Sequence, residues 1–152
     1  MFGSVNRRGG PNLQSYAATV EQILLNLGVD PVSARLHTEA GFGWSFQRGS
    51  AIIEVYVSHQ DNTGYLQVLS PILHLPQTGL LALYRHLLEL NLQLTNAALG
   101  VYLDVVYLFS ERPLDGLDHV EANNIISLVA NYADELDDRL MAEFGGRLYA
   151  RI

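Results

Sequence analysis

An alternating stretch at residues 41–76, GFGWSFQRGSAIIEVYVSHQDNTGYLQVLSPILHLP, constrains the fold more than any other part of the chain. Apolar residues recur there at every second position, which is the period of a half-buried strand. The pattern predicts three strands, near 41–47, 51–59 and 65–73. Polar and glycine-rich turns at 48–50 and 60–64 separate them. Because turns this short join antiparallel neighbours, the segment predicts an antiparallel sheet.

Helical periodicity appears on both sides of this stretch. The first helix is predicted from Asn12, a capping residue, to about Leu27, with Gly28 placed to end it. A second helix is predicted over 79–92. A third begins at Asp118, whose spacing to Glu121 resembles a capping box, and ends at a glycine pair, 145–146.

Residues 97–111, AALGVYLDVVYLFSE, are long enough for two short strands. They also fit one bent strand, because Asp104 is a poor turn signal by itself. With two strands here, the order is α-βββ-α-ββ-α. The chain is then an α+β protein with an antiparallel sheet of about five strands. We expect a flexible N-terminal arm at 1–11, a single domain at 12–146 and a C-terminal tail at 147–152.

Composition excludes several classes of protein. The 152 residues contain no cysteine, so disulfides, thiol nucleophiles and thiolate metal sites are absent. The net charge of −7 is concentrated between residues 113 and 144, where eight acids face one arginine. Nucleic acid needs a basic footprint, so it is not an expected partner. No apolar run approaches the roughly 20 residues that span a bilayer. These features predict a cytoplasmic protein without membrane insertion.

No catalytic or metal-binding motif is present. The five histidines include no pair three or four residues apart, the spacing that metal ligation on a helix requires. The acidic run at 134–140 has helical periodicity and lacks the turning loop of a calcium site, so it predicts a solvated helix face. The sequence therefore predicts no enzyme, no catalytic residues, no metal and no cofactor.

The helix at 79–92 has an unusually wide apolar face. Leu83, Leu90 and Leu94 extend its stripe beyond the width typical of a surface helix. These leucines are candidates for an interface with a partner or with a second copy of the chain. Asn91 interrupts the apolar face in the last turn. We expect its amide to be at least half-buried, with a structural role in binding main-chain groups at the helix-to-strand turn.

Aromatic residues in the first strands supply further interface candidates. Trp44 and Phe46 share one face, whereas Tyr56 has the opposite parity from its neighbours Val55 and Val57. Core packing is the simpler interpretation. An aromatic sheet face without helices is the alternative, and such a face suits peptide docking.

Several segments resemble those of a known family. They are FGWSFQRGSAIIEVYV, LQVLSPILHLP, LLALYRHLLELNLQL and PLDGLDHVEANNIISLVANYADELDDRL. In this order they are similar to the type III secretion chaperone-like fold, and within it to the YbjN-type proteins called putative bacterial sensory transduction regulators. The resemblance covers about residues 13–142. It implies a small, acidic, non-enzymatic protein, often homodimeric, that binds segments of other proteins.

The resulting expectation is a chaperone-like or adaptor protein that binds a segment of a partner protein, as a homodimer. A structural subunit of a fixed complex and a small-molecule sensor remain as alternatives. Fold resemblance alone does not choose among them.

Overall fold

The computed structural model describes residues 12–149. This part of the chain has four helices and seven strands, which confirms the predicted α+β class. The elements are α1 (Leu13–Asn26), α2 (Pro31–Ala34), β1 (Arg35–Leu36), β2 (Phe42–Arg48), β3 (Ala51–Gln60), β4 (Thr63–His74), α3 (Leu80–Asn91), β5 (Ala98–Tyr102), β6 (Val105–Pro113), α4 (His119–Phe144) and β7 (Arg147–Leu148). The predicted arm at 1–11 and residues 150–152 lie outside the described residues.

All seven strands form one antiparallel sheet. Its order is β1-β2-β3-β4-β6-β5, and β7 pairs with β4. The five predicted strands correspond to β2 through β6. The two additional strands have two residues each, too few to show an alternating pattern. One of them, β7, lies in the segment expected to be a C-terminal tail and pairs with Leu73 and His74.

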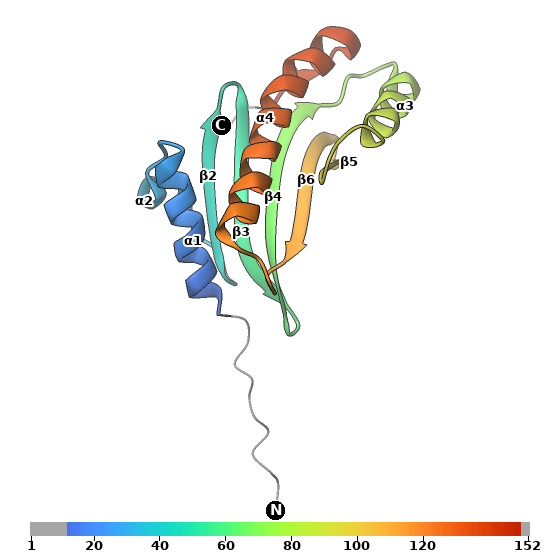
Figure 1. The fold of residues 1–152 in the computed structure, drawn as a ribbon. Coiled ribbons are helices and arrows are strands. Elements are labelled where there is room, and N and C mark those ends of the chain that lie inside the picture. The colour runs from blue at the N-terminus through green and yellow to red at the C-terminus, as the bar shows by residue number, and fades with distance from the viewer. Residues whose placement is uncertain (1–11, 150–152) are drawn as a thin grey trace, which may run out of the picture.

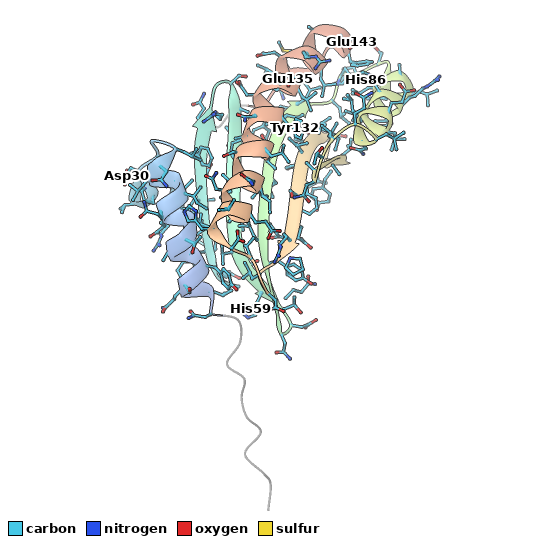
Figure 2. The ribbon with its side chains drawn as sticks, viewed as in Figure 1. Asp30, His59, His86, Tyr132, Glu135 and Glu143 are labelled. Atoms are coloured by element: carbon cyan, nitrogen blue, oxygen red, sulfur yellow. The ribbon has the colours of Figure 1, made fainter. Side chains whose placement is uncertain are left out.

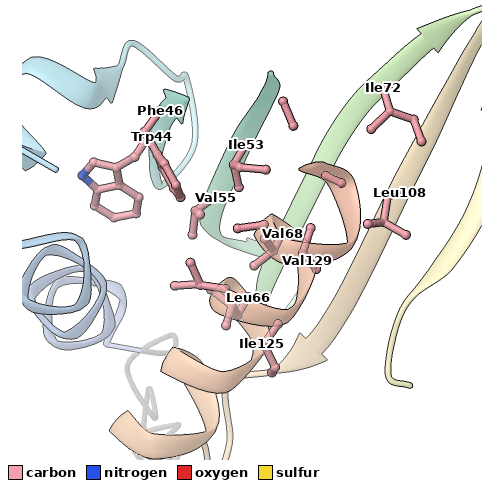
Figure 3. Packing of buried hydrophobic residues seen from close by; sticks show 14 of the residues in the cluster. Trp44, Phe46, Ile53, Val55, Leu66, Val68, Ile72, Leu108, Ile125 and Val129 are labelled. Atoms are coloured by element: carbon pink, nitrogen blue, oxygen red, sulfur yellow. The ribbon is translucent and has the colours of Figure 1, made fainter. Parts of the chain in front are cut away.

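The helices cover one face of this sheet (Figure 1), where α4 crosses β3, β4 and β6 and α1 runs beside β2. The core lies between the two layers. Figure 3 shows Val55, Leu66 and Val68 of the strands pointing toward Ile125 and Val129 of α4. These five side chains are at most 2% exposed. Burying them supplies the main favourable term for folding. None of the helices in residues 12–149 is long and apolar enough to cross a membrane.

The ends of the long helices follow their sequence signals. Asn12 caps α1 by accepting a hydrogen bond from the Ser15 amide at 3.3 Å. Asp118 caps α4 by accepting one from the Glu121 amide at 2.8 Å. Both predicted caps are confirmed. The four-residue helix α2 was not predicted, because Pro31 suits the first position of a helix as well as a loop after one.

Residues 97–111 form a hairpin and not one bent strand. Strands β5 and β6 pair from Ala98–Phe109 to Tyr102–Val105, leaving a two-residue turn. Both turn residues have positive φ, 46° at Leu103 and 62° at Asp104. Positive φ at both positions is the pattern of a type I′ turn, the connection that matches the twist of a tight hairpin.

Candidate functional site

Within the described chain, the helices leave one face of the sheet uncovered (Figure 1). Alternation along a strand sends every second side chain there. Cross-strand pairing arranges these residues in rows. One row runs Ser45–Glu54–Leu69–Phe109–Ala98 across five strands, and the next runs Gly43–Tyr56–Gln67–Glu111. On the other side of the first row lie Pro71, Tyr107 and Gly100. We call these three rows the open face.

A pocket of about 330 Å³ lies where the open face reaches the β5 edge. Its lining is apolar and aromatic: Leu69, Ala98, Leu99, Gly100, Val101, Tyr102, Tyr107 and Phe109. Gly100 contributes to the hollow, because a Cβ atom there would have no neighbour within 4 Å. Phe109 is 39% exposed and Tyr102 is 67% exposed, more than is usual for aromatic rings in a sheet. The pocket can accept apolar side chains.

Two carboxylates lie beside this pocket. Glu54 is the cross-strand neighbour of Leu69, and its Oε2 accepts a hydrogen bond from the Tyr56 hydroxyl at 3.2 Å. Glu111 lies two residues beyond Phe109, and its Oε2 accepts a bond from the Gln67 amide at 2.7 Å. The pKa of Tyr107 is raised, chiefly by burial and further by Tyr149, Glu54 and Tyr102.

The structure separates the three aromatic interface candidates. Trp44 and Phe46 face the helices and belong to the core (Figure 3), at 0% and 9% exposure. The indole N–H of Trp44 donates to Glu21 of α1 at 3.3 Å, and the Arg35 guanidinium lies over the Trp44 ring. Tyr56, by contrast, lies on the open face and is half-buried. Of the three candidates, Tyr56 alone is placed to contribute to a docking surface there.

The leucines of α3 and of the residues that directly follow it divide into two sets. Leu83 and Leu90 are buried in the core of the chain, and Leu94 is partly buried against it. Leu81, Leu88 and Leu92 point outward, with exposures of 84%, 68% and 90%. The packing of α3 explains the division, because its inner side contacts β5. Figure 2 shows His86 of α3 near the end of α4, where its ring contacts Phe144 at a centroid distance of 5.1 Å.

Asn91 forms the main-chain bonds predicted for it. Its amide nitrogen donates to the Leu99 carbonyl at 3.2 Å, and its amide oxygen accepts from the Leu99 N–H at 2.7 Å. The side chain is half-buried. Since β5 is the last strand of the sheet, both Leu99 groups point away from β6. Asn91 thus provides hydrogen-bond partners for main-chain groups at the sheet edge that would otherwise face solvent.

The acidic segment of α4 is only partly solvated. Ser50, in the β2–β3 turn, donates its hydroxyl to Asp137 at 2.7 Å and its backbone N–H to Asp134 at 3.1 Å. Asp137 is 1% exposed, so the prediction of a solvated helix face was wrong at this residue. Burial raises the pKa of Asp137, and the Ser50 hydrogen bond opposes that rise. Within residues 12–149, no three His, Cys, Asp or Glu side chains are grouped as metal ligands.

Sequence reasoning did not single out Leu69, Tyr107 and Phe109, the residues that shape the pocket. A usable signal was present. Each directly follows or precedes a core residue, Val68 or Leu108, so alternation assigns the three to the opposite face. The signal was incomplete because the hairpin at 97–111 was left open, and with it the pairing of β5, β6 and β4.

Comparison with known proteins adds the family to this geometry. A search of curated proteins finds no match. The family model described as T3SS (YopN, CesT) and YbjN peptide-binding chaperone 1, TY-Chap1, matches residues 17–151. The match spans most of the described chain, including most of α1, the whole sheet, α3 and α4. The chain therefore belongs to the TY-Chap1 family of T3SS and YbjN peptide-binding chaperones.

Proposed function

We propose that this protein is a non-enzymatic chaperone or adaptor that holds an extended segment of a partner protein on the open face, over the Leu69–Phe109 pocket. The observation that carries the proposal is the apolar pocket on a sheet face that no described helix covers. A flat, partly aromatic sheet surface with one hollow suits a strand-like peptide with an apolar anchor. Membership of a peptide-binding chaperone family supports the same conclusion.

We further propose that the protein acts as a homodimer through the outward side of α3. Leu81, Leu88 and Leu92 share one stripe of that helix, spaced seven and four residues apart. The stripe is bordered by an ion pair between Arg85 and Glu89 at 2.9 Å. A two-fold axis across such a stripe would pair leucines with leucines, which suits the self-complementary patch of an isologous contact.

The peptide-binding proposal is tested with two pocket variants of opposite design. Phe109→Ser removes one wall of the pocket, and Gly100→Val fills the hollow without removing any contact. Binding is measured by fluorescence anisotropy against an array of synthetic peptides that alternate apolar and polar residues. We expect both variants to lower the affinity for the best-binding peptides about tenfold or more, a loss of about 1.4 kcal/mol in binding free energy.

The matched control is Leu25→Ser, an apolar deletion at an exposed position of α1, away from the pocket and from the α3 stripe. Its peptide affinity should stay within about twofold of the native value, a change in binding free energy of well under 1 kcal/mol. Unchanged unfolding midpoints would show that the pocket variants remain folded. Peptide binding that survives both pocket variants would place the binding site elsewhere and contradict the proposal.

A further inference from the structure

The charges beside the pocket restrict the chemistry of the peptide. Glu54 lies in the same row as Leu69 and Phe109, and Glu111 lies in the next row. Adjacent strands are about 4.8 Å apart, and residues two apart along a strand are about 6.6 Å apart. Both carboxylates are therefore within one side-chain length of an apolar group seated in the pocket.

Both carboxylates retain the capacity to bind a cation. Glu54 accepts a hydrogen bond from Tyr56, and Glu111 accepts one from Gln67; both donors are neutral. A carboxylate has about four acceptor positions, so most of its capacity remains. The ion pairs found in residues 12–149 use four other glutamates: Glu21, Glu89, Glu121 and Glu135. Within that range, Glu54 and Glu111 take no part in a salt bridge.

The arginines of the described chain do not neutralise this end of the open face. Arg112 has the opposite parity on β6 and pairs with Glu121 of α4. Arg147 lies beyond Tyr107, in the row that contains His74 and Val105. The three rows of the open face thus contain the two carboxylates beside Leu69 and Phe109 and no arginine. A charge distribution of this kind favours a cationic group on a bound segment.

We propose that the open face selects extended peptide segments in which an arginine or lysine lies next to an apolar anchor. The anchor enters the Leu69–Phe109 pocket, and Glu54 and Glu111 bind the cation. The inference rests on the proposed peptide-binding function and specifies its ligand. Charge complementarity is the supporting observation.

The test uses three fluorescein-labelled peptides of about twelve residues, enough to cross the sheet. They share one leucine anchor and a Gly/Ser/Thr frame. They differ only at two flanking positions, which are arginine, glutamine or glutamate. We expect affinity in the order arginine, glutamine, glutamate, with about a tenfold span. The span should shrink between roughly 50 mM and 500 mM salt, because exposed charges are screened.

Two double variants decide the site. In Glu54→Gln/Glu111→Gln the three peptides should bind with equal affinity, close to that of the glutamine peptide on the native protein. The matched control, Glu135→Gln/Asp138→Asn, removes the same charge from the exposed side of α4 and should retain the full span. If the span survives the first variant, or disappears only in the second, the proposal is overturned.

The proposed function fails in a different way. If none of the three peptides binds and the peptide array also gives no binding, both proposals fall. A second outcome is that the native protein binds all three peptides with equal affinity, and that Phe109→Ser lowers this affinity equally for each. Peptide binding then stands, and only the inference about the cation is wrong. A fixed preference for the glutamate peptide would also overturn the inference.

Discussion

At the scale of single residues, Asn91 shows how one polar group can define the end of a sheet. Its primary amide donates to and accepts from the same residue, Leu99, much as a neighbouring strand would. An amide side chain offers both functions on two separate atoms, so it can bond the N–H and the carbonyl of one residue at once. A polar residue inside an apolar helical stripe was sufficient to predict main-chain bonding. That the bonds reach Leu99 could not be predicted, because it depends on how β5 docks against α3.

Replacing this amide should destabilise the fold. We expect Asn91→Leu to lower the free energy of unfolding by about 1–3 kcal/mol, because both Leu99 groups lose their partner. Asn91→Asp keeps the acceptor and loses the donor, so its effect should be smaller. Urea unfolding measures both. The control is Asn124→Leu, the same exchange at an exposed position of α4, which should change stability little. An unchanged urea midpoint in Asn91→Leu would show that the two bonds contribute nothing.

At the scale of elements, α4 is fixed to the β2–β3 turn by carboxylates as well as by its apolar stripe. Gly49 permits this approach: it has φ +56°, and a Cβ atom there would overlap the Asp134 carboxylate. The helix thereby brings Asp134 and Asp137 onto Ser50. The contact places a nearly fully buried acid where ordinary helix packing would place an apolar residue.

This contact predicts a specific pH dependence. Since burial raises the folded pKa of Asp137 above its usual 3.8, the folded state holds the proton more tightly than the unfolded chain. Its contribution to stability is therefore greatest below the ordinary pKa and declines as pH rises through the raised one. Asp137→Asn keeps an acceptor for Ser50 and removes this decline.

The comparison is made by urea unfolding between about pH 4 and pH 7, where ordinary acids also titrate. Asp137→Asn should lose less stability than the native protein over this range, and at pH 7 it should be at least as stable. Glu135→Gln, an exposed exchange on the same helix, should follow the native curve. If the Asp137→Asn curve runs parallel to the native one, the buried carboxyl is not the cause.

Element prediction succeeded where a pattern had room to repeat. The apolar pattern repeats several times in the long elements, which are the strands β2, β3 and β4 and the helices α1, α3 and α4. Elements of two to four residues, β1, α2 and β7, show none, and their positions depend on where longer elements dock. The face of each element was harder to assign. Trp44 and Leu83 were placed among interface candidates because a sequence shows that a residue is apolar, and not what covers it.

At the scale of the whole molecule, the proposed dimer concerns the only stripe of α3 that points away from the described core. We expect the native protein to be a dimer at micromolar concentration, and Leu88→Arg to be a folded monomer because it places a charge in the centre of the stripe. Sedimentation measures both states. Leu25→Arg, at an exposed leucine of α1, should remain dimeric. A native protein that sediments as a monomer would contradict the dimer.

One-sided coverage of the sheet has a consequence for adaptation. The helices pack on one face, so the side chains that hold the domain together are largely distinct from those that would meet a ligand. Substitutions at Leu69, Tyr107, Phe109 or the two glutamates can therefore accumulate with little cost in stability. A chain built this way can acquire a new peptide partner through substitutions on the open face alone. It is a candidate scaffold for engineered peptide binding. The residues of the open face would be redesigned for selectivity, and the core on the helix-covered face would keep the domain folded.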